Sequence, residues 1–241
     1  MSFEAAVLVV AFLSGATAAV VGFGIGSLLT PLLGTAVGMS AAVAAVAIPH
    51  AVATGIRCWR LRDEISWRVV RGFGLLSAAG GLAGAALHAR LGGRGLTLAL
   101  GGLLLLTASA GLTGWSRRWH PTGFLVPTLG LISGIFGGVA GNQGGLRVAA
   151  LGTFGLSPLG IVATSTAVGV LVDLARTPVY LWQSGGALLP MAGLVGLATA
   201  GVVLGTLTGE RLLRRLPEAV FRQVIAIAIG ALGIWLVVTA W

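Results

Sequence analysis

The sequence contains little charge: only 9% of its 241 residues are Asp, Glu, Lys or Arg, whereas 56% are hydrophobic. Because soluble domains carry roughly 25% charged residues, this chain has too few to cover a surface that faces water. The high hydrophobicity also excludes an intrinsically disordered chain. Glycine is abundant, with 40 residues, and in membranes it allows helices to pack closely or to break beside a cavity. The composition therefore predicts an all-α polytopic membrane protein.

Cysteine is scarce too, since Cys58 is the single one, which excludes an internal disulfide and a multi-cysteine metal site. No cluster of His or carboxylate residues offers metal ligands, and no Walker motif or nucleophile elbow is present. We therefore expect no metal, no cofactor and no enzymatic activity. The net charge of +9 comes from arginines between apolar runs. This placement is typical of cytoplasmic loops beside anionic lipid rather than of nucleic-acid binding.

Eight apolar runs can be distinguished, and two of them are too long for one crossing of about 20 residues. Glycine clusters divide these two, the first at Gly22–Gly26 and the fifth at Gly141–Gly145. Because glycine in a helix interior costs about 1 kcal/mol relative to alanine, we expect the helix to stop at both clusters. The runs cover 4–37, 40–57, 66–89, 95–115, 122–155, 158–183, 186–209 and 218–240.

The two glycine clusters coincide when the halves of the chain are aligned at an offset of 119 residues, so that Gly22 meets Gly141. This internal similarity divides one integral membrane domain into an N-terminal repeat, 1–119, and a C-terminal repeat, 120–241. Each repeat is expected to contain a glycine-broken segment, re-entrant or discontinuous, and three transmembrane helices.

Arginine placement predicts the orientation of these repeats. Clusters of arginine lie at 57–71, 117–118 and 211–222. All three share the cytoplasmic side only if the fifth run enters the membrane and returns, which makes the repeats inverted and places both termini outside. Arg90 and Arg94 do not fit this assignment.

Broken helices at matched places are typical of secondary transporters, whose substrate site lies between the breaks. A half-helix N-terminus exposes backbone N–H groups, which favour an anion. The second break also carries Asn142, Gln143 and Arg147 within an apolar run. A charge at the centre of a transmembrane helix costs about 2.5–3.5 kcal/mol on insertion scales, so Arg147 should face a cavity or a partner. The alternatives are that the glycines serve only close packing and that Arg147 snorkels to the interface or pairs with Asp173.

Two further sets of polar residues have the spacing of a helix face. Asp173, Arg176 and Tyr180 lie on one helical face, and so do His50 and Arg57. Asp173 and Arg176 could form a local ion pair or take part in proton coupling. His50 could be a hydrogen-bonded core residue or a proton-coupling group, because its ordinary pKa lies near neutrality.

The chain resembles the sulfite exporter TauE/SafE family over nearly all of its length. The resemblance rests on Ser14-Gly15 with Gly22–Gly26, on the recurrence of this pattern from Ser133, and on the string Asn-Gln-Gly-x-Leu-Arg from Asn142 to Arg147. Further matching positions are Ala163-Thr164, Val172-Asp173, Arg176, Val179-Tyr180, His50 and Arg57. The resemblance implies ATP-independent transport of small sulfur oxyanions or organosulfonates. Asn142 and Gln143 replace the consecutive glycines of the commoner pattern, which leaves open whether sulfite itself is the substrate.

These arguments predict a multi-pass secondary transporter in the bacterial inner membrane, with a small anion and the lipid bilayer as its partners and a homodimer as one option. A passive channel for ions or small solutes is the main alternative, and a membrane-embedded assembly factor is a third. The candidate substrate-binding residues are Gly22, Gly24, Gly26, Gly141, Asn142, Gln143, Gly144, Arg147, Arg57, Arg176 and Thr164. The candidates for proton coupling are His50, Asp173 and Tyr180.

Overall fold

The computed structural model describes residues 2–114, 123–213 and 218–240, and within these ranges the chain is helical and has no strand. Four helical stretches of the described residues are long and apolar enough to cross a membrane. They are Phe3–Val21, Met39–Arg60, Trp67–Thr113 and Pro158–Thr208. The last two contain 47 and 51 residues, so each has the length of two crossings of about 20 residues. The expectation of an all-α membrane protein is confirmed at this level.

The first long apolar run forms two helices, as expected from its glycines. Helix α1 (Phe3–Val21) ends at Gly22, whose φ of 83° is the left-handed conformation that glycine adopts without strain. Helix α2 (Ile25–Val37) begins after Gly24, which has a φ of 137°. A Cβ on Gly24 would lie 2.9 Å from Cγ2 of Thr17. The chain therefore turns back along α1 at this break.

The fifth run breaks in the same manner. Helix α7 (Leu125–Ala140) ends at Gly141, whose φ is 70° and whose N–H donates to the Gly137 carbonyl at 3.1 Å. Helix α8 (Gly144–Leu151) follows, and a 3₁₀ turn, η3 (Gly152–Phe154), ends the segment. The Ser133 hydroxyl lies 3.5 Å from the Gln143 carbonyl, so this chain also turns back on itself.

The second to fourth runs form the rest of the N-terminal half. Helix α3 (Met39–Arg60) leads into the short turns η1 (Arg62–Glu64) and α4 (Trp67–Val69) and a π-helical turn, η2 (Val70–Gly74). Helix α5 (Leu75–Thr113) is continuous by hydrogen bonding but contains Gly92 at φ 64° and ψ 169°, a non-helical conformation. Gly92 therefore divides α5 into two helices, as expected from the separate apolar runs 66–89 and 95–115.

The C-terminal half continues with helix α9 (Pro158–Leu188), a 3₁₀ turn, η4 (Leu189–Met191), helix α10 (Ala192–Leu213) and helix α11 (Glu218–Thr239). Ser157 caps α9 by accepting the N–H of Gly160 at 3.0 Å, and Pro158 occupies the first helical position, where its missing N–H is harmless.

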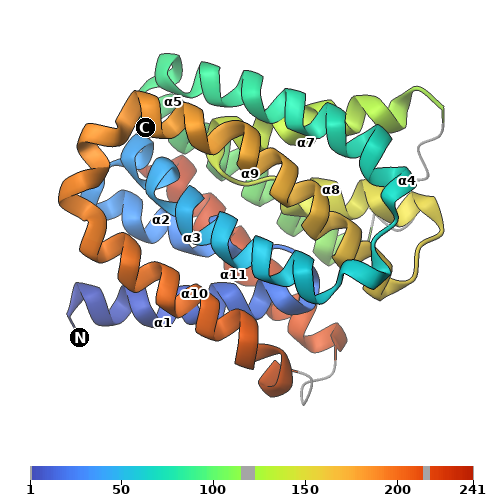
Figure 1. The fold of residues 1–241 in the computed structure, drawn as a ribbon. Coiled ribbons are helices and arrows are strands. Elements are labelled where there is room, and N and C mark those ends of the chain that lie inside the picture. Colours follow the sequence, from blue (N-terminus) through green and yellow to red (C-terminus); the bar gives the residue numbers. More distant parts are fainter. Residues whose placement is uncertain (1, 115–122, 214–217, 241) are drawn as a thin grey trace.

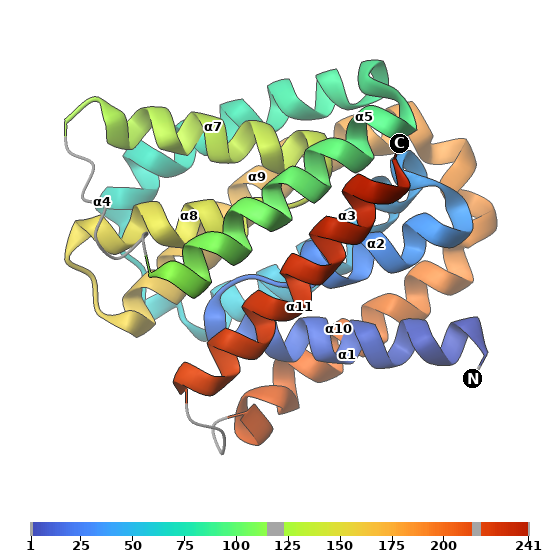
Figure 2. The same ribbon diagram turned by 180° about the vertical axis from the view of Figure 1, so that it is seen from behind.

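Glycines allow the helices to pack closely in a repeated arrangement. Helix α1 packs against α10, and α7 packs against the first part of α5. A Cβ on Gly205 of α10 would clash with the backbone carbonyl of Phe12, and a Cβ on Gly134 of α7 would clash with that of Ser77. Helices α3 and α9 pack against each other through the middle of the molecule, as Figures 1 and 2 show. This central pair positions the site described below.

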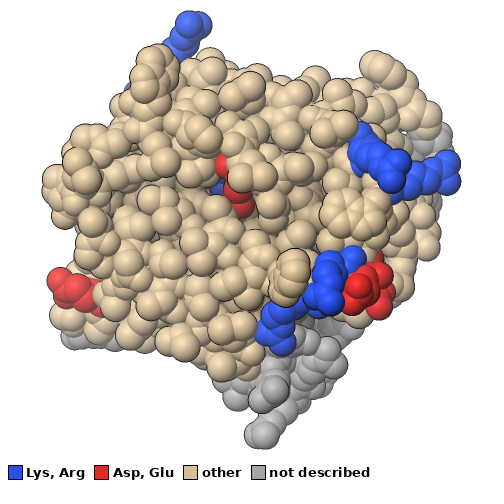
Figure 3. Space-filling model, in the orientation of Figure 1, with Lys and Arg blue, Asp and Glu red and all other residues tan. Residues whose placement is uncertain are grey.

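Both ends of the chain lie at one end of the helix bundle (Figures 1 and 2). Helix α3 ends at the opposite end, where the exposed arginines Arg60, Arg62, Arg68 and Arg71 gather, on the right of Figure 3. Arg90 and Arg94 are exposed beside the Gly92 kink, at the same end as the termini. The arginine cluster at 117–118 lies outside the described residues, and so do the arginine side chains of the 211–222 cluster.

Candidate functional site

The two helix breaks meet inside the molecule. A Cβ on Gly26 would clash with the backbone carbonyl of Gly141, and a Cβ on Gly144 would clash with the Phe23 side chain. The Asn142 side-chain amide donates to the Ser27 hydroxyl at 3.0 Å, and this bond is buried. Glycine is therefore required at these two positions because each break lies directly against the other.

The N-terminus of α8 begins at this meeting point without a side-chain cap. Gln143 is the residue before the first turn, and its side chain makes no capping hydrogen bond to the helix. The amide nitrogen and oxygen of that side chain are both buried without a partner, and Gln143 is only 3% exposed. Buried polar groups are normally paired, so these two unpartnered amide atoms, which lie against Gly137 of α7, make Gln143 a candidate for contact with a polar ligand.

Arg147 follows on the first turns of α8 and is 1% exposed. Its Nε donates to the Ser165 hydroxyl of α9 at 2.9 Å, whereas its Nη1 is buried without a partner. A Cβ on Gly169 would lie 3.4 Å from both terminal nitrogens of this guanidinium and 3.1 Å from Cγ2 of Thr54. Arg147 therefore reaches between α3 and α9, and it neither snorkels outward nor forms an ion pair with Asp173, the two alternatives left open above.

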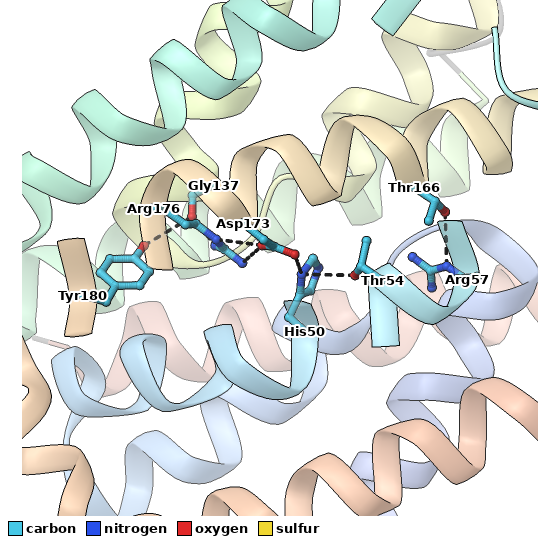
Figure 4. Close-up of polar contacts among 8 residues, drawn as sticks. All are labelled: His50, Thr54, Arg57, Gly137, Thr166, Asp173, Arg176 and Tyr180. Atoms are coloured by element: carbon cyan, nitrogen blue, oxygen red, sulfur yellow. Dashed lines mark hydrogen bonds and ion pairs between the residues drawn. The ribbon is translucent and has the colours of Figure 1, made fainter. Parts of the chain in front are cut away.

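Arg57 on α3 is held in a similar way, by a hydroxyl of α9. It is 4% exposed, its Nε donates to the Thr166 hydroxyl at 3.1 Å, and its Nη1 is buried without a partner. Thr166 follows directly after the Ser165 that binds Arg147, so consecutive hydroxyls of α9 hold the two guanidiniums. Figure 4 shows the contact between Arg57 and Thr166. Each arginine is thus oriented by a neutral hydroxyl and has one buried terminal nitrogen, Nη1, without a hydrogen-bond partner.

Asp173 of α9 binds two cationic or ionisable partners. Its Oδ1 accepts from Nε of Arg176 at 3.0 Å and lies 2.9 Å from Nη2 of the same side chain. Its Oδ2 lies 2.6 Å from Nδ1 of His50 on α3, and the Thr54 hydroxyl lies 3.3 Å from that nitrogen. The result is a buried chain of contacts across α3 and α9 (Figure 4). The ion pair between Asp173 and Arg176, one of the two alternatives for these residues, is present, and His50 contacts the same carboxylate.

The carbonyl end of α7 is covered by side chains. Arg176 donates to the Gly137 carbonyl, Tyr180 donates to that of Gly138, and His88 of α5 lies 2.8 Å from that of Val139. The rings of His88 and Tyr180 pack edge to face, with centroids 5.2 Å apart. The negative end of the α7 dipole is therefore neutralised, while the positive end of α8 beside it stays uncapped. At the second break, the carbonyl end of α7 is therefore hydrogen-bonded, whereas the N-terminus of α8 has no side-chain cap.

Some candidate site residues have another role in the structure, and some residues near the site were not selected from the sequence. Thr164 accepts the backbone N–H of Ser66 at 3.0 Å, so its hydroxyl is used at the end of the bundle where α4 lies. Gly22 and Gly24 form the turn of the first break. Sequence reasoning did not select Ser27, Thr54, His88 or Ser165 as site residues. Of these four, only Thr54 had a signal in the sequence, because its spacing of four from His50 places both residues on one helix face.

The site lies behind a largely uncharged surface. Figure 3 shows a little acidic and basic colour at the bottom of a small opening in the middle of the face that α3, α9 and α10 cover. Asp173 and Arg176 are only 2% and 1% exposed. Charged groups that are this deeply buried within apolar helices face a partner or a cavity rather than lipid.

Comparison with known proteins places this arrangement within a family. No curated protein and no solved structure matches the chain. The family model described as Sulfite exporter TauE/SafE matches residues 7–236, which is nearly the whole chain. The match includes both breaks and Arg57, Arg147 and Arg176, the arginines that are buried among the described residues. The chain therefore belongs to the sulfite exporter TauE/SafE family of membrane transporters.

Proposed function

We propose that this protein is a secondary transporter that moves a small sulfur oxyanion or organosulfonate across the bacterial inner membrane without ATP. The observation that carries the proposal is the pair of buried arginines, Arg147 and Arg57, whose Nη1 atoms have no partner. The uncapped N-terminus of α8 and the orphaned Gln143 amide lie at the same break. Together they provide the directed donors that an oxyanion needs.

The anion would bind where the two breaks meet. Arg147, Asn142 and Gln143 would contact it directly, together with the backbone of Gly141 and Gly144. Arg57 would contribute a second charge, and Arg176 a positive field partly cancelled by Asp173. From the first break, Gly22, Gly24 and Gly26 would shape the opposite wall. Thr164 would act indirectly, by holding the chain at Ser66.

Alternating access would come from two inverted repeats, 1–119 and 120–241, that rock against each other. Three features support this proposal: left-handed glycines end α1 and α7, both broken segments turn back on themselves, and glycines of matching position bring α1 to α10 and α7 to α5. The exposed arginines after α3 favour that end of the bundle as the cytoplasmic one.

Proton coupling would use the pair of His50 and Asp173, which are 2.6 Å apart. A proton on His50 changes the charge beside the carboxylate that neutralises Arg176, so the field at the anion would depend on it. Tyr180 lies at the end of the same chain of contacts, and its hydroxyl donates to the Gly138 carbonyl. We assign Tyr180 to holding the α7 end against α9, where it can transmit a change at Arg176 to the break.

Flux measurements in proteoliposomes test the proposal. Arg147→Ala should lower uptake of a labelled sulfur anion at least about tenfold, because a hydrogen bond to a charged group contributes about 1.5–3 kcal/mol. Arg68→Ala, at an exposed arginine, is the matched control and should leave uptake unchanged. Equal flux through wild type and Arg147→Ala would contradict the assignment. Preloaded unlabelled substrate should accelerate uptake, and a lack of this counterflow would favour the passive channel.

A further inference from the structure

The buried charges of the site do not cancel. Among the described residues, three arginines and one aspartate are buried: Arg57, Arg147, Arg176 and Asp173. Asp173 forms an ion pair with Arg176, which leaves Arg57 and Arg147 without a carboxylate among the described residues. The interior therefore carries two uncompensated positive charges when His50 is neutral, and three when it is protonated.

We propose that the site is built for a dianion, so that one bound anion with two negative charges neutralises Arg57 and Arg147 together. This inference rests on the proposed transport of a small anion and adds the charge of the substrate. It selects sulfate-like and sulfocarboxylate-like anions over sulfonates that carry a single charge and over zwitterionic sulfonates.

The physical reason is the cost of an unpaired charge away from water. An ion in a protein interior costs several kcal/mol unless a counter-charge and hydrogen bonds compensate it. A monoanion leaves one guanidinium uncompensated, whereas a dianion compensates both. The uncapped N-terminus of α8 adds a partial positive charge of the same sign, equivalent to about half an elementary charge.

The hydrogen bonds of the two arginines leave both charges uncompensated. Ser165 and Thr166 each accept one Nε–H, and neither hydroxyl neutralises charge. Both guanidiniums are thus bound by neighbouring residues of α9, and Nη1 has no hydrogen-bond partner on either. Gly169, one turn further along α9, has no side chain to occupy the space beside Arg147.

Binding of matched anions to the purified protein tests the inference. Sulfate and methanesulfonate are both small tetrahedral sulfur anions, but sulfate carries two charges and methanesulfonate one. Sulfoacetate and ethanesulfonate form a second pair of this kind. The protein should bind each dianion at least about tenfold more tightly than its partner, measured by calorimetry or by thermal stabilisation at equal concentration.

Two variants at Arg57 test whether its charge produces the preference for dianions. Arg57→Gln leaves one uncompensated charge, so the preference for sulfate over methanesulfonate should shrink by about tenfold or invert. Arg57→Lys keeps the charge and should keep the preference. If Arg57→Gln fails to fold, the wild-type ratio together with Arg57→Lys still decides the question.

The outcomes separate this inference from the proposed function. Equal or tighter binding of the monoanions by wild type, with flux intact, would overturn the dianion rule while transport stands. An unchanged preference in folded Arg57→Gln would also overturn it. If none of the four anions binds or is transported, the proposed function itself fails.

Discussion

The carboxylate of Asp173 makes several of the buried polar contacts of the site. One carboxylate oxygen accepts a hydrogen bond from Arg176, and the other contacts the His50 ring. Among the described residues, Asp173 is the only buried carboxylate. Removing its charge would leave Arg176 unpaired beside two other buried arginines. Breaking a buried ion pair in this way typically costs about 3–5 kcal/mol.

Asp173→Asn should therefore lower the free energy of unfolding by about 3–5 kcal/mol and reduce the thermal midpoint in detergent. Leu174→Ala, a neighbour on α9 that is 67% exposed, is the control and should change the midpoint much less. An unchanged midpoint in Asp173→Asn would show that the carboxylate does not balance these arginines.

The sequence could predict part of this residue-scale picture. Helical spacing places Asp173 and Arg176 on one face, and the cost of a buried charge singles out Arg147. The partners could not be predicted, because His50 and Asp173 are 123 residues apart and Ser165 looks like any serine in an apolar helix. Only the packing of α3 and α8 on α9 brings these groups together.

Glycine has two distinct roles in the helices. At the breaks, Gly22 and Gly141 end helices because they adopt left-handed φ values. Along α7, Gly134 instead removes a side chain where the helix lies against the Ser77 carbonyl of α5. The sequence predicted the breaks, since clustered glycines disfavour helix, but it could not say which of the other glycines lie at a contact.

Gly134→Ala tests the close packing of α7 on α5. The added Cβ would meet a backbone atom, so we expect a loss of about 1–3 kcal/mol in stability. Gly102→Ala offers a matched control, because Gly102 lies exposed within α5 and a Cβ there meets nothing within 4 Å. That variant should be neutral or stabilising by up to about 1 kcal/mol. Equal midpoints for the two variants would argue against the close contact.

The membrane topology of the whole molecule depends on whether the two broken segments are re-entrant. If both broken segments return to the side from which they enter, reporters fused at 119 and 216, both outside the described residues, should lie in the cytoplasm. A reporter at Gly92, at the kink of α5, should lie on the opposite side, where the structure places the start of α1. Opposite locations for 119 and 216 would reject the re-entrant arrangement.

The sequence by itself determined the class of the protein, its helical runs and the positions of its breaks. These follow from local rules, because a bilayer leaves backbone groups no partner except within a helix, and clustered glycine interrupts one. The tertiary structure decided which break faces which and which hydroxyl orients each arginine. It also decided that Asp173 pairs with Arg176 and His50, while Arg57 and Arg147 have no carboxylate within ion-pair distance among the described residues. These are contacts between helices distant in the chain, and no local pattern encodes the direction in which a side chain meets its partner.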